Sequence, residues 1–154
     1  MIPFIYDDIF YSRQYEEDDD LIGVGLFPEN QRKWGFIGGN GKLIIPPVYD
    51  EVRWFDKNRC PVQKDGKWGI IDKNGKEIVP FIYDDMSFFY DELSRVRNKY
   101  GEYGFIDIDG KVVIPLIYEG IYFLWRDGFT RVRKYGKYGF INKKGVSPYP
   151  PPKF

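Results

Sequence analysis

An aromatic residue followed by glycine recurs four times in this chain at nearly constant spacing. Successive pairs lie 34, 35 and 35 residues apart, and they are Trp34-Gly35, Trp68-Gly69, Tyr103-Gly104 and Tyr138-Gly139. Such a period is typical of repeat proteins, in which each unit buries its apolar face against its neighbours. Residues that recur in every unit are expected to build the unit. A functional surface is therefore sought where the units differ.

The sequence of each unit predicts short β-hairpins. Asn-Gly or Asp-Gly between apolar runs is a strong hairpin signal, because glycine accepts the positive φ that the turn needs. These turns are Asn40-Gly41, Asn74-Gly75, Asp109-Gly110 and, with lysine, Lys144-Gly145. A proline follows in the second run and marks a strand end or a sheet edge, because it cannot donate to a β-ladder. The prolines are Pro46, Pro80 and Pro115, each followed three residues later by a tyrosine, Tyr49, Tyr83 and Tyr118.

Composition agrees with β-structure. Aromatic residues make up 19% of the chain and alanine is absent, a balance that favours strands over helices. We therefore predict an all-β fold without substantial helix, built as a tandem array of about four hairpin repeats that is curved or closed on itself. Closure would hide open strand edges, and the opposite charges of the chain ends would favour it. In the alternative, the Pro-rich tail caps the end of an open array.

The repeat also predicts the domain organisation. We expect a single domain over residues 1–154, with one partial unit at each end. An acidic insertion lengthens the first partial unit, and the last one lacks the Pro-x-x-Tyr half. The expected parts are a first partial unit at 1–33, full repeats at 34–67, 68–102 and 103–137, a last partial unit at 138–147, and an extended, Pro-rich tail at 148–154.

The aligned units resemble a known family. They read KWGFIGGNGKLIIPPVYDEV, KWGIIDKNGKEIVPFIYDDM, EYGFIDIDGKVVIPLIYEGI and KYGFINKKGVSPYPPPKF, which is similar to the WG (KWG) repeat of bacterial proteins. The resemblance covers roughly residues 30–145, and it departs from the family pattern at Gly38-Gly39 and in the fourth unit. It implies a repeat fold and a binding or scaffolding role, because the family carries no established catalytic residues.

The absence of histidine removes several kinds of chemistry. Histidine triads and histidine-containing zinc sites are impossible, and one cysteine allows neither an internal disulfide nor a multi-cysteine metal site. We expect no cofactor and no metal, and we expect Cys60 to be a small buried residue. An enzyme would have to use carboxylates, lysine, tyrosine or serine, and the candidate carboxylates are Asp50-Glu51 and Asp84-Asp85. Their recurrence instead predicts acids that accept backbone N–H groups at turns.

The charges of the chain are concentrated at its two ends, with opposite signs. Residues 1–20 hold seven acids and one base, a net of −6, whereas residues 121–154 hold eight bases and one acid, a net of +7. The acidic run lies in an insertion, and insertions in repeat proteins commonly carry binding sites. The predicted partner-binding residues are Glu16, Glu17, Asp18, Asp19, Asp20, Trp54, Trp125 and Arg126. The aromatic-Gly pairs themselves are expected to pack between units.

These features favour a non-enzymatic protein–protein binding module, such as an inhibitor or immunity-type protein for a basic partner. One alternative is carbohydrate or cell-envelope binding through Trp54 and Trp125, and another is a carboxylate hydrolase. A net charge of zero and a pI near 6.3 argue against nucleic acid, although Tyr135, Tyr138 and Phe140 interleave with bases. The chain shows neither a signal peptide nor a long apolar run, so a cytoplasmic location is expected.

Overall fold

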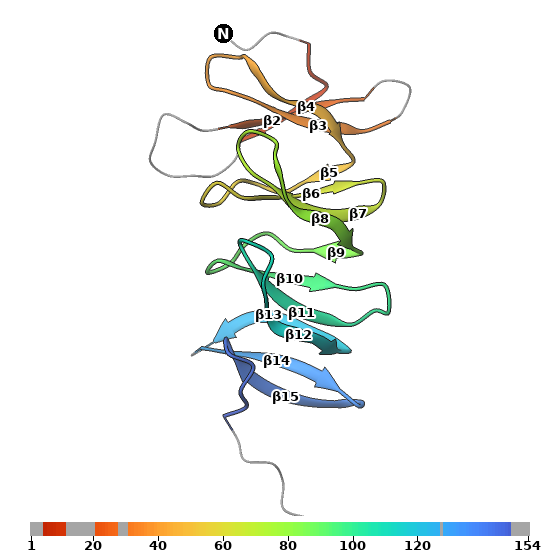
Figure 1. Cartoon of the computed structure of the whole chain (residues 1–154), viewed down its shortest axis with the longest axis vertical. Helices are drawn as coiled ribbons and strands as arrows, with labels where there is room; N and C mark the ends of the chain where they lie inside the picture. Colours follow the sequence, from red (N-terminus) through yellow and green to blue (C-terminus); the bar gives the residue numbers. More distant parts are fainter. Residues whose placement is uncertain (1–4, 12–20, 28–30, 127, 149–154) are drawn as a thin grey trace, which may run out of the picture. The chain divides into compact units, whose positions relative to one another are not determined.

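The structure is a computed structural model that describes residues 5–11, 21–27, 31–126 and 128–148. For Phe10, Tyr11 and residues 123–126 it describes the backbone alone. The chain divides into two compact units, unit 1 (Met1–Ile82) and unit 2 (Tyr83–Phe154). Short strands form four sheets in the described residues, and these residues contain no helix (Figure 1). The predicted all-β fold of short hairpins is thus confirmed.

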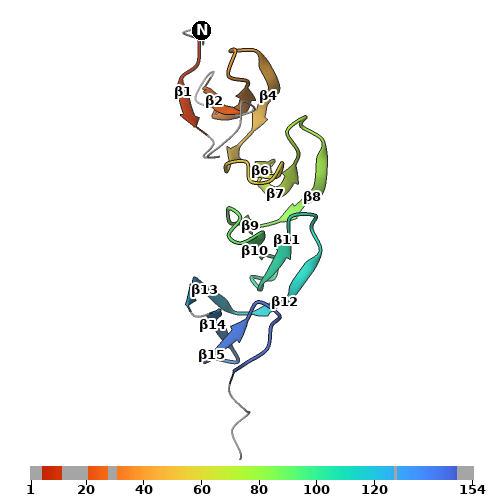
Figure 2. The ribbon, with the colours of Figure 1, turned by 90° about the vertical axis from the view of Figure 1, so that its left-hand side faces the viewer.

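Unit 1 holds two sheets, each with its strands in chain order. The first has the order β1-β2-β3-β4 and the second β5-β6-β7-β8, and Figure 2 shows β1 beside β2. The strands of the first sheet are β1 (Asp8–Tyr11), β2 (Ile22–Leu26), β3 (Lys33–Ile37) and β4 (Leu43–Tyr49). Those of the second are β5 (Glu51–Val52), β6 (Cys60–Lys64), β7 (Lys67–Ile71) and β8 (Glu77–Tyr83).

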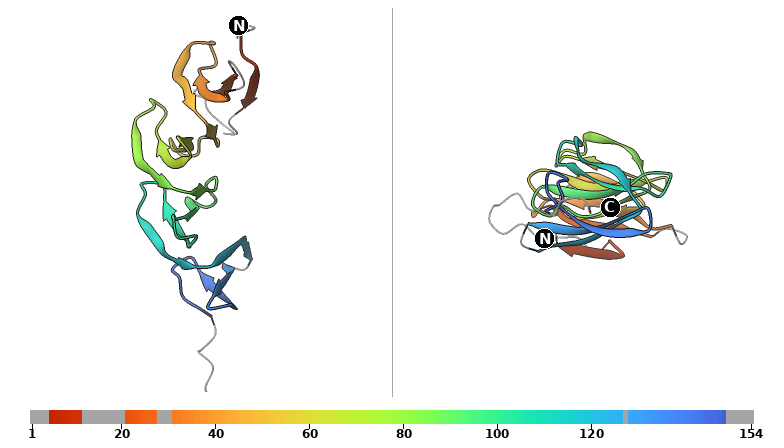
Figure 3. Two further views of the ribbon diagram at one scale, coloured as in Figure 1. Left: turned by 90° about the vertical axis from the view of Figure 1, so that its right-hand side faces the viewer. Right: turned by 90° about the horizontal axis from the view of Figure 1, so that it is seen from below.

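Unit 2 repeats this plan with a shorter last sheet. Its first sheet has the order β12-β11-β10-β9, and the described residues of its second sheet form β13, β14 and β15. The strands are β9 (Asp85–Met86), β10 (Leu93–Arg97), β11 (Tyr103–Asp107), β12 (Val112–Tyr118), β13 (Gly120–Arg126), β14 (Phe129–Lys134) and β15 (Lys137–Asn142). Only Glu119 separates β12 from β13, so the long strand leads directly into the next sheet (Figure 3).

The predicted glycine turns close the hairpins through the same backbone hydrogen bonds each time. At the turn after β7, the Asp72 N–H donates to the Lys76 carbonyl, and the Asp72 carboxylate accepts from the N–H groups of Asn74 and Lys76, all at 2.9 Å. Gly75 has a φ of 81°, in the left-handed region that glycine enters without a Cβ clash. The resulting three-residue loop fixes where the two strands meet.

The long strand of each hairpin carries a bulge at its proline. Trp34 pairs with Tyr49 and Phe36 pairs with Ile45, so Gly35 alone faces the three residues between Ile45 and Tyr49. The strands β11 and β12 show the same registers around Gly104. Pro46, Pro80 and Pro115 lie inside edge strands of seven residues, so the edge interpretation of these prolines is correct and the strand-end interpretation is wrong.

The bulge explains the glycine of the aromatic-Gly pair. A Cβ added at Gly35 would overlap the Ile45 carbonyl oxygen, and one at Gly104 would overlap the Ile114 carbonyl oxygen. Gly69 faces the Val79 carbonyl in the same way. Only glycine lets the bulged backbone approach this closely.

The apolar core of each unit lies between its two consecutive sheets. In unit 2 one cluster joins the long-strand side of the first sheet to the next sheet, and its members include Phe105, Ile114, Tyr118, Ile121, Val132 and Ile141. In unit 1 the corresponding cluster includes Phe36, Ile45, Tyr49, Cys60, Val62 and Ile71. One face of a sheet therefore stacks on the opposite face of the sheet that follows it.

Candidate binding surface

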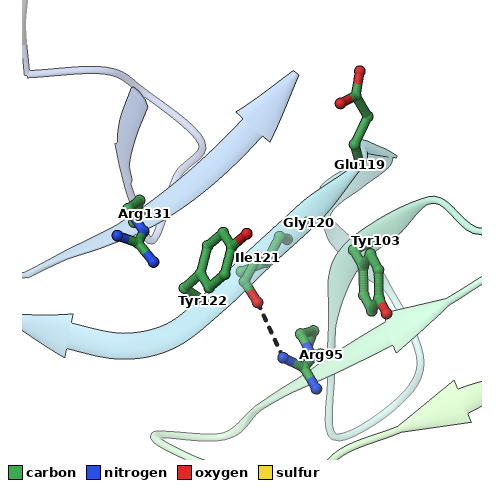
Figure 4. A pocket seen from close by; sticks show the side chains of 7 residues that line it. All are labelled: Arg95, Tyr103, Glu119, Gly120, Ile121, Tyr122 and Arg131. Carbon is green, nitrogen blue, oxygen red and sulfur yellow. Dashed lines mark hydrogen bonds between the residues drawn. The ribbon is translucent and has the colours of Figure 1, made fainter. Parts of the chain in front are cut away.

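A groove opens in unit 2 where the first sheet meets the second. Its volume is about 570 Å³, and its walls come from β10, β11, β13 and β14 (Figure 4). The lining residues are Arg95, Tyr103, Glu119, Gly120, Ile121, Tyr122 and Arg131. Arginine and tyrosine side chains thus dominate the groove, and both types are enriched among the residues that contribute most to protein–protein binding.

Arg95 bridges the two sheets at the base of the groove. Its guanidinium donates to the Ile121 carbonyl at 3.0 Å, the contact marked in Figure 4, and lies 5.4 Å from the centre of the Tyr103 ring. The Asp85 carboxylate lies 3.9 Å from the same guanidinium. These contacts hold the arginine in place, so little side-chain entropy remains to be lost when a ligand binds.

Arg131 lies on the exposed side of the last sheet among tyrosines. Its guanidinium carbon lies 4.1 Å from the centre of the Tyr122 ring and 5.3 Å from that of Tyr138. The two rings are 5.9 Å apart. A hydrogen bond with Tyr138 raises the pKa of Tyr122 above its usual value.

The acid of the groove is already engaged. Glu119 accepts the Gly136 N–H at 3.2 Å and lies 3.5 Å from the Arg133 guanidinium, and its carboxylate points away from Arg95 in Figure 4. In unit 1, Asp50 accepts the Gly66 N–H at 3.2 Å and binds the Lys33 ammonium at 2.5 Å. The bond from Lys33 holds the Asp50 pKa below its usual value. Both acids thus accept a backbone N–H group at a turn, the role that was predicted for Asp50.

The outer face of the last sheet is exposed, unlike the equivalent face of the first sheet in each unit. Phe140 is 45% exposed, whereas Phe36 and Phe105 at the same repeat position are 0% exposed. Tyr138 is 60% exposed, and an added Cβ at Gly139 would meet no described atom within 4 Å. The residues that pack against a following sheet elsewhere are therefore accessible here.

Unit 1 has a smaller groove at its own sheet junction. It measures about 240 Å³ and is lined by Trp34, Glu51, Val52, Arg53 and Trp54. The Arg53 guanidinium lies 4.5 Å from the centre of the Trp68 ring, and Trp68 is buried. The four aromatics of the aromatic-Gly pairs thus occupy different environments: Trp34 and Tyr103 line grooves, Trp68 is buried, and Tyr138 is exposed.

The predicted partner-binding residues fall in different parts of the chain. Trp54 lies in the groove of unit 1 and is 38% exposed. Residues Glu16, Glu17, Asp18, Asp19 and Asp20 lie outside the described residues. Trp125 and Arg126 belong to β13, and their side chains lie outside the described part of the structure. Their joint role in partner binding stays a prediction.

Sequence reasoning missed Arg95, Tyr122 and Arg131. A signal for the arginines was present, because Arg95 and Arg97 flank the buried Val96 just as Arg131 and Arg133 flank the buried Val132. Side chains alternate along a strand, so both pairs point to the face opposite their valine.

Comparison with known families identifies the chain. The model for the WG containing repeat matches residues 34–68, 68–100 and 103–138, which together exceed half of the sequence. The chain therefore belongs to the WG repeat family, as the resemblance predicted. No curated protein matches it. Within the part of the chain that the structure describes, no helix has the length and apolar character to cross a membrane.

Proposed function

We propose that this WG-repeat chain is a non-enzymatic protein-binding module whose partner binds unit 2. The observation that carries the proposal is a set of tyrosines and arginines at the groove, in which Tyr122, Tyr138 and Arg131 are exposed and Tyr103 and Arg95 are half-buried. Tyrosine offers a large, rigid contact area at low entropic cost, and arginine binds carboxylates through two parallel hydrogen bonds. We therefore expect a partner segment that carries an acidic side chain next to an apolar or aromatic one.

The states of the reactive groups support a non-enzymatic role. Asp50 and Glu119 bind backbone N–H groups and basic side chains of their own unit. The Asp50 pKa is lowered, whereas a general acid needs a raised one. Burial raises the pKa of the Cys60 thiol, and its Sγ lies inside the core of unit 1, so a thiolate nucleophile is disfavoured.

Partner capture with paired variants tests the proposal. The wild-type chain, the double variant Tyr122→Ala/Arg131→Ala, and the control Lys99→Ala would be used to capture proteins from the source cell under identical conditions. A protein retained by the control and lost with the double variant supports the proposal. Equal capture by all three chains, or tight binding of a single-stranded oligonucleotide at the same residues, contradicts it.

A basic partner, such as the target of an inhibitor or immunity-type protein, remains a separate proposal that rests on the acidic run of residues 16–20. Complementary charge raises association rates, and salt screens the effect. Replacing all five acids by serine should slow association with such a partner at low salt and leave the rate at high salt nearly unchanged. An unchanged rate at low salt contradicts this refinement.

Carbohydrate binding is a second candidate, and the groove of unit 1 favours it. Trp54 and Trp34 line an open groove with Arg53, and tryptophan rings commonly stack on sugar faces. Titration with soluble cell-envelope oligosaccharides should quench tryptophan fluorescence in the wild type, and Trp54→Ala should abolish the quenching. Quenching that survives in this variant contradicts a site at Trp54.

A further inference from the structure

In the first three hairpins a long strand, β4, β8 or β12, pairs with the strand that carries the aromatic-Gly pair. The fourth hairpin, which begins with β15, has the same residues, but no long strand pairs with it in the described residues. Strand β15 pairs with β14 on one side, and the sheet ends there. The sequence Lys137-Tyr-Gly-Phe-Ile-Asn142 matches Lys33–Ile37 and Lys67–Ile71 in residue type. The Gly145 N–H donates to the Asn142 carbonyl at 2.9 Å, as in the other glycine turns.

The first hairpin shows what a seated strand contributes. Tyr49 pairs with Trp34, and Ile45 lies opposite Phe36, which is fully buried. The bulge between them passes over Gly35. The next residue, Asp50, divides its two carboxylate oxygens between the Lys33 ammonium and the Gly66 N–H.

The exposed hairpin is complementary to another such strand. Tyr138 and Phe140 would face the tyrosine and the β-branched residue, and the open position above Gly139 would accept the bulge. Lys137 stands where Lys33 stands, and it has no acidic partner among the described residues. An unpaired strand edge of this kind is a template for an added strand.

A fourth segment of the chain carries the long-strand pattern. Ile2-Pro3-Phe4-Ile5-Tyr6-Asp7 matches Val79–Asp84 at every residue except the first, where isoleucine replaces valine. The other three segments are β4, β8 and β12, each seated on its own hairpin. This segment therefore has the sequence that pairs with such a hairpin in the other repeats.

The described end of this segment is placed like the end of a long strand. The Asp7 N–H donates to the Gly25 carbonyl at 2.9 Å, as the Asp50 N–H donates to the Gln63 carbonyl. One Asp7 oxygen accepts the Phe27 N–H at 2.6 Å. Tyr6 packs against Ile22, Val24 and Ile37 of the next sheet, as Tyr118 packs against Ile121. The second oxygen of Asp7 would be placed to bind a lysine at the position of Lys33.

We propose that residues Ile2–Asp7 of a second copy of this chain add to the edge of β15, with Tyr6 opposite Tyr138 and Asp7 beside Lys137. A further sheet after β13–β15 repeats the junction seen within unit 2, and the first sheet of another copy can fill that place. The acidic residues 1–20 and the basic residues 121–154 favour this head-to-tail contact. The chain's own tail competes poorly, because prolines at 148, 150, 151 and 152 remove ladder donors.

This inference goes beyond the proposed function, because it concerns the edge of β15 and a copy of the chain itself. A head-to-tail contact uses different surfaces on the two copies. It therefore builds rings or filaments rather than symmetric dimers.

Sedimentation of the full chain over a wide concentration range tests the proposal. The wild type should associate as its concentration rises, and Gly139→Ala should weaken association at least about tenfold, since the loss of roughly 1.4 kcal/mol has that effect. The control Gly39→Ala adds a methyl group in open space and should associate like the wild type. A second variant, Ile2→Asp/Phe4→Asp, should be unable to add its N-terminal strand to another copy. Mixing it with Gly139→Ala should give dimers only, because one intact N-terminal strand and one intact β15 edge remain.

Three results overturn the proposal. They are a wild type that stays monomeric at all concentrations, association that Gly139→Ala leaves unchanged, and a monomeric wild type whose melting temperature Gly139→Ala lowers, which would indicate pairing within one copy. Partner binding is measured on the Ile2→Asp/Phe4→Asp variant, which leaves Tyr122, Arg131 and Tyr138 unchanged, so the loss of the copy contact and the loss of partner binding can be told apart.

Discussion

The third and fourth hairpins of the chain share the sequence Tyr-Gly-Phe-Ile and a glycine turn but differ in what covers them. Phe105 lies under β12 and the following sheet, while Phe140 at the same repeat position is exposed. Gly104 faces a bulged backbone, and Gly139 faces open space. The same residues of the repeat can therefore be buried or exposed. Whether they form core or surface depends on whether a long strand and a following sheet cover them.

The largest contrast should come from the two phenylalanines. Phe105→Ala leaves a cavity in the core of unit 2 and should lower the free energy of unfolding by about 3–5 kcal/mol. Phe140→Ala removes a half-exposed ring and should lower it by about 1 kcal/mol or less. Chemical denaturation of the monomeric protein measures both. Similar losses at the two sites would show that Phe140 is covered in solution.

The two glycines should give the next contrast. Gly104→Ala forces the bulge of β12 away and should destabilise unit 2 by about 1–3 kcal/mol. Gly139→Ala should change stability by about 0.5 kcal/mol or less, because no described atom lies within 4 Å of the new methyl group. Thermal melts of the two variants compare them directly. A large loss for Gly139→Ala would mean that a strand already lies over β15.

Lys33 and Lys137, which precede the first and the last aromatic-Gly pair, provide a smaller contrast that depends on pH. Lys33 lowers the pKa of Asp50, so this pair stabilises the folded state above the unfolded-state pKa of about 3.9, and the contribution is lost as pH falls through the folded-state pKa. Lys33→Ala should raise the Asp50 pKa and lower stability at neutral pH by about 1 kcal/mol or less. Lys137→Ala should leave the stability of the monomer unchanged. NMR titration of the carboxylates and melts across pH check both statements.

The smallest effect is expected at a turn of the fourth hairpin. Tyr135 has a φ of 51°, while Asp65 holds the same place, at the same φ, in the turn before β7. A tyrosine is strained in this region, whereas asparagine tolerates it. Tyr135→Asn should therefore raise stability by about 0.5 kcal/mol. A loss of stability would show that the exposed ring makes a contact that the turn geometry does not reveal.

Much of the fold could be predicted, because its determinants are local. Glycine after Asn40 or Asp109 demands a positive φ, and proline at position 46 cannot donate to a ladder. The bulge itself was harder to predict, since it depends on how Pro46 pairs across the sheet with Gly35. The candidate surface was harder still. Arg95 and Tyr122 come from different sheets and meet only through the stacking of those sheets, whereas Trp54 was predicted from residue type alone.

The lone cysteine gives the chain an internal reporter. Cys60 is fully buried in unit 1, its thiol donates to the Arg53 carbonyl at 3.3 Å, and no other thiol exists in the sequence. A thiol reagent can therefore modify the native protein only when this part of unit 1 opens. The labelling rate would measure the opening free energy of one half of the chain without any engineered label. The effect of a change at β15, in unit 2, could then be compared with the opening of unit 1 reported by Cys60.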